Sequence, residues 1–453
     1  MARHRSILRV AALGGLGLLL AAATPSPSKV FPYPLTSETL ENGLKVVFVR
    51  MPTPGLVAYY TLVRVGSRNE VEPGHSGFAH LFEHMMFRGT KKYPAEAWET
   101  RLKARGVDST AFTWNDQTVY TFIAPTEALP TIVEMEADRF QNLTYTKQVF
   151  QTETKAVLGE YHKNYANPTE KMEEVLLDQA FSRHTYKHST MGFLADIRKM
   201  PARFEYGLRF FQRFYRPDNC VVFVVGDFDR SRVLALVRKH YGSWQGKAEE
   251  QRLPEEPPQR KERRRHVAWE TDTQARLMVG YHTPSLGTDL KAAAAQNVLG
   301  PYHFGENSPL YRELVLDRQL VESMHSQYVD TRDPRLFYFL VTLSTEGHLA
   351  AVEKRIAKAV AEVASGKLDA RRLADVQSNL RYGLLMGLEA PATVAETLAL
   401  AATPTGDPGA LDALYDQIAR LRPEELAAFA RRYLVPENRT VVTLTGAARK
   451  SRP

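Results

Sequence analysis

The chain has 453 residues, of which 44% are hydrophobic and 24% charged, a composition typical of a globular protein large enough for two cores. Its single cysteine, Cys220, excludes an intrachain disulfide framework and a metal site built from several thiolates. The net charge is +8, and a basic run spans Arg260 to Arg265. Because no aromatic residues are interleaved with this run, we interpret it as a solvated linker and not as a nucleic-acid patch.

The N-terminus has the pattern of a signal peptide. Three arginines in the first nine residues precede the apolar stretch Val10 to Ala23, which at 14 residues is too short to span a bilayer. Small residues end the stretch, so we expect cleavage after Ala23 and an exported protein, periplasmic or secreted. The alternative is retention of residues 1–23 as a membrane anchor. No later segment is apolar enough to span a membrane.

The first structural signals of the mature chain are two apolar segments, Leu44–Val49 and Val57–Val65, which predict strands. The segment Gly77 to Phe87, GFAHLFEHMMF, then predicts a strongly apolar helix. Ser76 is the expected N-cap of this helix, because a hydroxyl before the first apolar residue accepts hydrogen bonds from free amide groups.

Three polar residues share one face of this helix. His80 and His84 are one turn apart, and Glu83 lies between them. Two neutral imidazoles at this spacing hold one Zn²⁺, and the carboxylate reaches a water on the metal. The order His-x-x-Glu-His inverts the commoner His-Glu-x-x-His. A helix whose polar residues only face solvent is disfavoured, because polar groups converging in an apolar helix need partners.

The rest of the first half alternates between helix and strand signals. A helix is predicted at Pro94–Ala104, and strands near Ala111 and at Val119–Ala124. The apolar run Val221–Val225 predicts a final strand, next to which Cys220 is expected to be a buried, inert thiol.

A third zinc ligand is expected in the helical run Lys147 to Ala166. This run contains Glu153 and Glu160, which are seven residues apart and so share a face. Only one of them is expected to bind zinc, and the other to orient a ligating histidine through its free ring N–H. The spacing does not decide which carboxylate does which, and a solvated pair of carboxylates is the alternative.

The sequence contains an internal repeat. The segment Arg213–Val225 recurs as Arg432–Leu444, with a Pro and an Asn of each copy at the same offset of 219. The strand-like segment from Leu56 superposes on Ala275–Thr283 at nearly the same offset. We therefore predict two copies of one domain, at 30–245 and 266–450, joined by a linker at 246–265. The expected fold class is α+β, each copy a mainly antiparallel sheet with helices packed on it.

Four motifs together resemble the pitrilysin, insulysin and mitochondrial processing peptidase family of zinc metallopeptidases. They are GFAHLFEHMMFRGT, ETKAVLGEYHKNYANP, HTYKHSTMG and RFYRPDNCVVFVVGDFD. The resemblance runs from Thr39 to Ala447. It implies that Glu160 completes the zinc site, that Glu153 supports it, and that Glu83 is the general base. It also implies two homologous domains facing each other around a cavity, and hydrolysis of peptide bonds in peptides or unfolded proteins.

The second copy carries NVLGPYHFG where the first has the histidine motif, so we expect one zinc ion per chain. Relatives also use a strand near the zinc that begins with Asn-Ala and pairs with the substrate. Here Thr110, Ala111 and Phe112 stand at that place, and they are weak candidates for substrate contacts.

A larger departure concerns an Arg and, seven residues later, a Tyr that catalytic relatives carry in the second domain to hold the substrate. Val315 and Glu322 occupy those places here, although Arg312 and Arg318 are nearby. We therefore expect the chain to be the zinc-bearing half of a heterodimer whose homologous partner supplies the missing pair. The alternatives are a self-sufficient homodimer and a non-catalytic scaffold. The sequence does not indicate the substrate.

Overall fold

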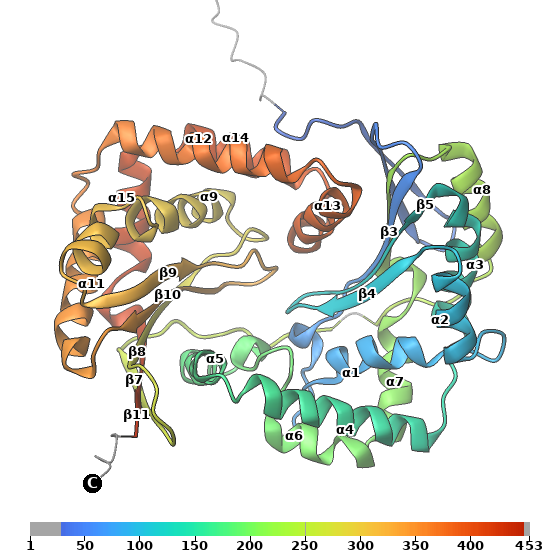
Figure 1. The fold of residues 1–453 in the computed structure, drawn as a ribbon, viewed down its shortest axis with the longest axis horizontal. Coiled ribbons are helices and arrows are strands. Elements are labelled where there is room, and N and C mark those ends of the chain that lie inside the picture. The colour runs from blue at the N-terminus through green and yellow to red at the C-terminus, as the bar shows by residue number, and fades with distance from the viewer. Residues whose placement is uncertain (1–28, 250, 448–453) are drawn as a thin grey trace, which may run out of the picture.

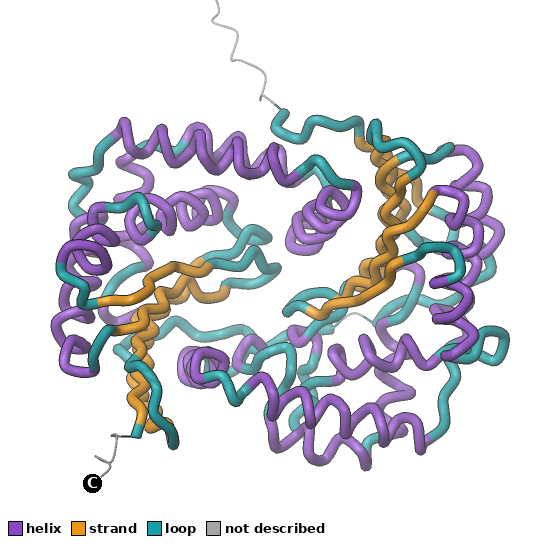
Figure 2. The backbone as a smooth tube through the Cα atoms, in the orientation of Figure 1, coloured by secondary structure: helices purple, strands orange, loops and turns teal. Residues whose placement is uncertain are grey.

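The computed structural model describes residues 29–249 and 251–447. The predicted signal peptide, residues 1–23, lies outside these ranges. Within them, no helix combines the length and the apolar character needed to cross a bilayer. The described chain forms two halves, each with its own sheet and its own set of helices (Figures 1 and 2).

The first sheet has six strands in the order β1-β2-β6-β3-β5-β4, so that β4 lies at one edge. All neighbours are antiparallel except β2 and β6. The strands are β1 (Leu35–Thr39), β2 (Lys45–Arg50), β3 (Leu56–Val63), β4 (Asp108–Thr113), β5 (Thr118–Pro125) and β6 (Cys220–Gly226).

The second sheet has five strands in the order β7-β11-β8-β10-β9, and only β7 and β11 are parallel. The strands are β7 (Arg263–Trp269), β8 (Arg276–Thr283), β9 (Val321–Gln327), β10 (Arg335–Leu343) and β11 (Arg439–Gly446). The predicted α+β class with two mainly antiparallel sheets is confirmed. Strand β7 begins inside the range predicted as a linker, and Arg264 of this strand forms ion pairs with Glu262 and Glu353.

The helices divide between the two halves. The first half contains α1 (Phe78–Met85), α2 (Ala95–Lys103), α3 (Leu129–Asn142), α4 (Lys147–Asn164), α5 (Pro168–Ala180), α6 (Leu194–Lys199), α7 (Phe204–Phe214) and α8 (Arg230–Tyr241). The second contains α9 (Leu290–Leu299), α10 (Pro309–Tyr311), α11 (Leu349–Ala364), α12 (Ala370–Gly387), α13 (Pro391–Thr405), α14 (Ala410–Arg420) and α15 (Pro423–Tyr433).

The predicted repeat is visible in matching turns. In each half, a 3₁₀ turn of sequence Pro-Asx/Glx-Asn leads into the last strand. The side-chain amide of Asn219 donates to the Phe214 carbonyl at 2.9 Å, and the side-chain amide of Asn438 donates to the Tyr433 carbonyl at 2.7 Å. Both asparagines therefore close the same turn, and two copies of one domain account for this.

Each half has one helix that packs on the sheet of the other half. Helix α13 of the second half packs on the face of the first sheet that its own helices leave open, and helix α5 of the first half packs on the second sheet (Figure 1). In the first case Val394 and Leu398 bury Tyr60 and Leu62, and in the second Leu176 and Leu177 bury Met278 and Leu340. Burial of such side chains stabilises by roughly 1.5–3 kcal/mol each, so these contacts hold the two halves together.

The hairpin turns of the two sheets also meet. The turn between β4 and β5 supplies Asp116, whose carboxylate accepts hydrogen bonds from the Tyr186 hydroxyl at 2.6 Å and from the Arg332 amide at 2.8 Å. The turn between β9 and β10 supplies Asp333, whose carboxylate accepts from Arg68 Nε at 2.6 Å and lies 3.0 Å from His184 Nε2. These bonds fix the two halves relative to each other next to the cavities between them.

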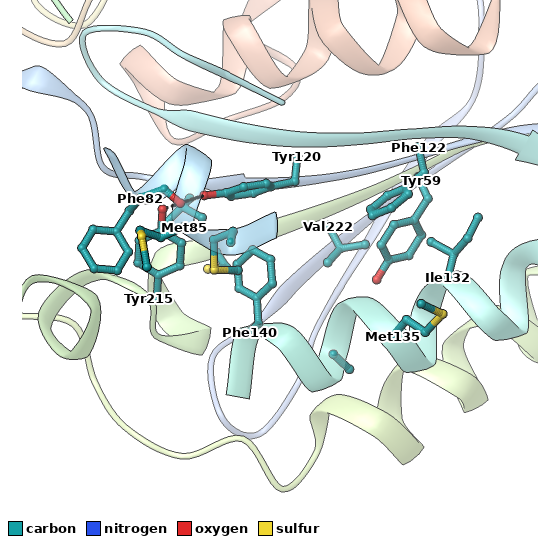
Figure 3. Packing of buried hydrophobic residues seen from close by; sticks show 14 of the residues in the cluster. Tyr59, Phe82, Met85, Tyr120, Phe122, Ile132, Met135, Phe140, Tyr215 and Val222 are labelled. Atoms are coloured by element: carbon teal, nitrogen blue, oxygen red, sulfur yellow. Dashed lines mark hydrogen bonds between the residues drawn. The ribbon is translucent and has the colours of Figure 1, made fainter. Parts of the chain in front are cut away.

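The core beneath α1 is aromatic. Figure 3 shows Tyr120 and Tyr215 beside Phe82, with the Tyr120 hydroxyl donating to the Phe82 carbonyl at 3.2 Å. In the same core an ion pair between Arg139 and Glu136 is almost completely buried, with side-chain exposures of 1% and 0%. Rings surround the Arg139 guanidinium, namely those of Phe87, Trp98, Tyr120, Phe122 and Phe140.

Candidate metal centre

The motif helix α1 starts at a strained position. Gly77 precedes it with a φ of 91°, and a Cβ atom there would lie 2.6 Å from the Met191 carbonyl oxygen. Only glycine fits both the left-handed conformation and this close approach. Helix α1 is therefore held at a fixed position against the loop that contains Met191.

The predicted N-cap is wrong. Gly77 and not Ser76 occupies the N-cap position, and the free amide groups of Gly77 and Ala79 each donate to the carboxylate of Glu70 at 2.7 Å. The Ser76 hydroxyl instead donates to Asp196 at 2.6 Å. Glu70 does the capping because a loop brings its buried carboxyl group to the helix N-terminus, where each of its two oxygens accepts a hydrogen bond from a free backbone amide.

Three of the predicted residues converge. The ligand atoms of His80, His84 and Glu160 all lie within 4.8 Å of one another. Glu160 Oε2 is 3.6 Å from His80 Nε2 and 3.3 Å from His84 Nε2. This is the one group of three or more metal-ligating side chains in the described ranges that could hold a metal ion.

The donor set fits zinc. In a tetrahedral site with bonds of about 2.0–2.1 Å, neighbouring ligand atoms lie about 3.3–3.4 Å apart, close to the two separations here.

The environment of His80 keeps its ring in the neutral form that binds a metal. Burial, and then the neighbouring His84, lower the pKa of His80 to about 4, so His80 is a neutral base at neutral pH. Its Nδ1 atom is buried without a hydrogen-bond partner among the described residues.

His84 has a different environment. Burial lowers its pKa, but the nearby carboxylates of Glu153, Glu83 and Glu160 outweigh this effect, and the net shift is upward. Three carboxylates around two imidazoles create a strongly negative site. A divalent cation would compensate this charge, which is a second reason why the residues fit zinc.

Glu83 faces the same site from α1. The hydroxyl of Thr113, the last residue of β4, donates to Glu83 Oε2 at 2.6 Å. Burial raises the pKa of Glu83, and the Thr113 hydrogen bond partly opposes this. A carboxylate with a raised pKa is a better proton acceptor at neutral pH than an exposed one.

Glu153 lies behind the histidines. Its Oε2 is 3.7 Å from His84 Nδ1, and its Oε1 is 3.2 Å from Arg88 Nε. The side chain is only 6% exposed, whereas that of Glu160 is 36% exposed. The structure therefore puts Glu153 on the far side of His84 from Glu160, where it can orient the imidazole.

The predicted substrate-contacting residues lie on β4, the edge strand next to α1. Ala111 packs on the core beneath α1, and Phe112 lines a cavity between the two halves. The Thr110 carbonyl accepts a hydrogen bond from Thr121 on β5. Because β4 has a neighbour on one side only, its outer edge is available to an extended peptide.

The described part of the second half has no equivalent group of metal-ligating side chains. At an offset of 219, Leu299, Tyr302 and His303 stand in the places of His80, Glu83 and His84. His303 is half-buried, and its two ring nitrogens are buried without a hydrogen bond of normal geometry to any described residue. Burial lowers its pKa to about 4. Glu362 lies 3.8 Å from His303 Nε2, but no third metal-ligating side chain joins them among the described residues, so they do not form a zinc site.

The positions that differ from the family pattern lie in the second half. Glu322 is exposed on β9, and Val315 packs against the second core. Of the two nearby arginines, Arg318 forms an ion pair with Glu313.

Three site residues escaped the sequence analysis, namely Glu70, Arg88 and Thr113. Arg88 is four residues after His84, so helical spacing could have predicted that it lies on the same face as the motif. Glu70 and Thr113 reach α1 from a loop and a strand, and no spacing in the sequence indicates such contacts.

Comparisons with known proteins place these features in a family. The model of the insulinase family, peptidase family M16, matches residues 45–193, and the model of the M16 inactive domain matches residues 208–380. The first match contains the converging residues, and the second covers most of the other half.

Similar proteins cover nearly the whole chain. The zinc protease PqqE of Helicobacter pylori is 27% identical over 98% of this chain and 99% of its own length. A crystal structure of a protease from Helicobacter pylori superposes with a TM-score of 0.85 at 26% identity, covering 91% of this chain and 99% of that one. The periplasmic protease PqqL of Escherichia coli has the same fold, with a TM-score of 0.73 at 21% identity, but this chain covers only 48% of it.

Proposed function

Because the chain belongs to the M16 peptidase family, we propose that it is a zinc-dependent endopeptidase that hydrolyses peptides or unfolded polypeptides. The observation that carries the proposal is the convergence of His80, His84 and Glu160 beside Glu83. Several relatives are named zinc proteases, which supports the same class of activity. We assign one zinc ion per chain to the three converging ligands.

The chemistry that zinc supplies when bound is Lewis-acid polarisation of the attacking water and of the scissile carbonyl. Glu83 accepts the proton of the water and then delivers it to the nitrogen of the leaving amine. The Thr113 hydroxyl fixes Oε2 of Glu83, which leaves Oε1 as the oxygen that accepts the proton. Glu153 holds the ring of His84 in the orientation that directs Nε2 at the metal position.

The edge strand β4 aligns the substrate. Its free backbone N–H and C=O groups pair with an extended peptide, which becomes an additional strand beside the motif helix. Thr110, Ala111 and Phe112 lie along this strand and contact the substrate through their backbones. This mode selects unfolded segments, since folded strands are already paired.

We further propose that the active assembly contains a homologous partner subunit. Val315 and Glu322 occupy the positions at which relatives carry the Arg and Tyr that hold the substrate. The periplasmic protease PqqL supports this idea, because its chain is about twice as long as the part that this fold covers. The partner would supply the missing Arg/Tyr pair. A homodimer that uses Arg312 or Arg318 is the alternative. Assaying this chain alone and mixed with a homologue distinguishes the two.

The N-terminal stretch of 14 apolar residues supports export, and we propose that the mature protein works in the periplasm or outside the cell. N-terminal sequencing of the secreted or periplasmic protein would test the expected cleavage after Ala23. An intact N-terminus in a membrane fraction would instead identify a retained anchor.

The zinc site is tested by metal analysis of purified variants. We expect close to one zinc ion in the wild type and in Glu83→Gln, and none in His80→Ala or Glu160→Ala. In a competent assembly, Glu83→Gln should lower turnover by roughly 10²–10⁴ because it removes the general base and keeps the shape. Glu96→Gln, an exposed acid on α2, is the matched control. Full zinc occupancy in Glu160→Ala would show that another residue is the third ligand.

The partner is tested by mixing. We expect weak or absent hydrolysis by this chain alone and strong hydrolysis with a homologue that bears the Arg/Tyr pair. Loss of one oxyanion donor lowers kcat by about 10²–10³, so replacing the partner's Arg should abolish most of the gain without changing the zinc content of this chain. Rapid hydrolysis of unstructured peptides by this chain alone would refute the pairing and leave the zinc assignment intact.

A further inference from the structure

The two helices that carry the candidate zinc ligands come from separate parts of the chain. His80 and His84 lie on α1 and Glu160 lies on α4, with α2, β4, β5 and α3 between them in the sequence. The two helices lie side by side and contact each other (Figure 1). The three ligands converge only if the first turn of α1 and the C-terminal half of α4 are held at a fixed separation. One loop, residues 188–193, contacts both of these helix ends.

The loop 188–193 packs tightly against the start of α1. Gly192 has a φ of 83°, and a Cβ atom on it would lie 2.6 Å from the backbone nitrogen of Gly77. On the other side of this contact, the Met191 carbonyl oxygen occupies the space that a Cβ atom of Gly77 would need. The backbone amide of Phe193 also donates to the Ser76 hydroxyl at 2.9 Å. Two glycines in the left-handed region therefore let the main chain of the loop touch the main chain at the helix start.

The same loop holds the C-terminal end of α4. The hydroxyl of Tyr165, the C-cap residue of α4, forms a hydrogen bond of 2.7 Å with the hydroxyl of Ser189, and either group can be the donor. Beside this bond, Asn164 Nδ2 donates to Sδ of Met191 at 3.9 Å. Met191 therefore contacts α1 through its backbone and α4 through its side chain. Glu160 precedes Tyr165 by five residues, which is about 7.5 Å along a helix axis.

The two hydroxyl groups border a cavity next to the metal centre. Tyr165 and Ser189 line this cavity, which has a volume of about 270 Å³, together with Thr113, whose hydroxyl donates to Glu83. Because the pair faces a cavity, either hydroxyl can bond to water once the other has been removed. Removal of one hydroxyl therefore leaves no buried polar group without a partner, which is the costly case for folding.

We propose that the loop 188–193 is a positioning element of the metal centre, which sets the separation between α1 and α4 and so brings Glu160 to the two histidines. The hydroxyl pair of Tyr165 and Ser189 is its attachment to α4. A loop that only connected Lys187 to α6 would need neither this pair nor a close backbone contact with α1. The inference rests on the proposed zinc site and extends it, because it names residues outside the ligands that determine the affinity for the metal.

The test measures zinc affinity after removal of the hydroxyl pair. Tyr165→Phe and Ser189→Ala each delete one hydroxyl, and each should weaken zinc binding by about 2–10-fold, the factor that corresponds to one hydrogen bond. Because both changes break the same bond, the double variant should bind zinc as tightly as the single variants. Affinity is measured by competition with a chromophoric chelator. Co²⁺-loaded variants should also show a shifted visible absorption band, since this band depends on the arrangement of the ligands.

Two matched variants serve as controls. Tyr93→Phe removes a tyrosine hydroxyl that donates to Glu134 on α3 at 2.6 Å, a contact that involves neither α1 nor α4, and should leave zinc affinity unchanged. Ser189→Thr keeps a hydroxyl and should bind zinc more tightly than Ser189→Ala. The unfolding midpoint of each metal-free variant is measured as well. The midpoint of metal-free Tyr165→Phe should fall no further than that of Tyr93→Phe, which separates a loss of zinc affinity from a general loss of stability.

Wild-type zinc affinity in both Tyr165→Phe and Ser189→Ala, an equal loss in Tyr93→Phe, or additive losses in the double variant would overturn the positioning role. The two proposals fail separately. Zinc-dependent hydrolysis with unchanged zinc affinity in these variants would refute only the role of the loop. Weakened zinc binding in the variants, without hydrolysis by the wild type in any assembly, would refute only the peptidase function.

Discussion

The hydroxyl of Thr113 donates a 2.6 Å hydrogen bond to Glu83 Oε2, which joins the edge strand β4 to the motif helix α1. The strand that would align the substrate and the carboxylate that would accept the proton therefore touch directly. Movement of either element changes the distance between the substrate and the base.

Thr113→Val should lower kcat by about 10-fold in a competent assembly, because Glu83 loses the group that fixes its orientation. Zinc content should not change, since Thr113 contacts none of the three ligands in the described structure. Thr113→Ser keeps the hydroxyl and should retain most of the activity. Equal kcat values for Thr113→Val and wild type would show that Glu83 needs no such support.

Glu153→Gln should weaken zinc binding by about 10–100-fold, because the amide is a poorer acceptor for the ring N–H of His84. A competition titration with a chromophoric chelator measures this change. Arg88→Gln should have a smaller effect, since the Arg88 side chain is 40% exposed and its pairing with Glu153 is screened by solvent. An unchanged zinc affinity in Glu153→Gln would refute the orienting role.

Arg139→Met should destabilise the protein by about 3–5 kcal/mol, because it leaves the buried Glu136 carboxylate without its cation. The double variant Arg139→Met/Glu136→Leu should recover much of this loss, since both charges are then removed. Urea unfolding midpoints compare the three proteins. A single variant as stable as wild type would mean that Glu136 is protonated or solvated.

Asp333→Asn should reduce stability at pH 7 but not at strongly acidic pH. Burial would raise the pKa of Asp333, but hydrogen bonds from His184 and Arg68 outweigh it and hold the pKa well below its ordinary value near 3.8. A carboxylate with a depressed folded pKa contributes stability above about pH 4, and this contribution is lost as the pH falls further. The difference in thermal midpoint between wild type and Asp333→Asn should therefore shrink below pH 4.

The corresponding difference for Asp317→Asn, an exposed acid without an ion pair among the described residues, should stay small at every pH. A difference for Asp333→Asn that does not depend on pH would show that the bonds between the halves are maintained by the protonated acid as well.

Much of the fold could be predicted because its signals are local. Apolar segments predicted β2, β3 and β5 to within two residues of their ends, and the repeated Pro-x-Asn turn predicted two copies of one domain. The convergence of His80, Glu83 and His84 follows from helical periodicity alone. Glu160 required the family resemblance, because the spacing from Glu153 left both carboxylates as equal candidates.

The rest depends on contacts that the sequence does not encode locally. The apolar faces of α5 and α13 predict burial but do not say against which sheet. Strand β7 could not be predicted from the basic run, because edge strands tolerate exposed charged side chains and so show no apolar pattern there. The carboxyl group of Glu70 that caps α1 comes from a loop, whereas the sequence favoured the adjacent Ser76 hydroxyl as the N-cap.

The exchange of α5 and α13 has a consequence for how the chain acquires its structure. The first sheet is complete once β6 has been synthesised, but residues 391–405, which cover its open face, come more than 160 residues later. An apolar sheet face therefore stays uncovered while these residues are synthesised, and the first half cannot finish folding before α13 has been made. Such late, long-range closure slows folding. Slow closure would suit the export proposed for this chain, because an apparatus that threads unfolded chains would then receive it before it has folded.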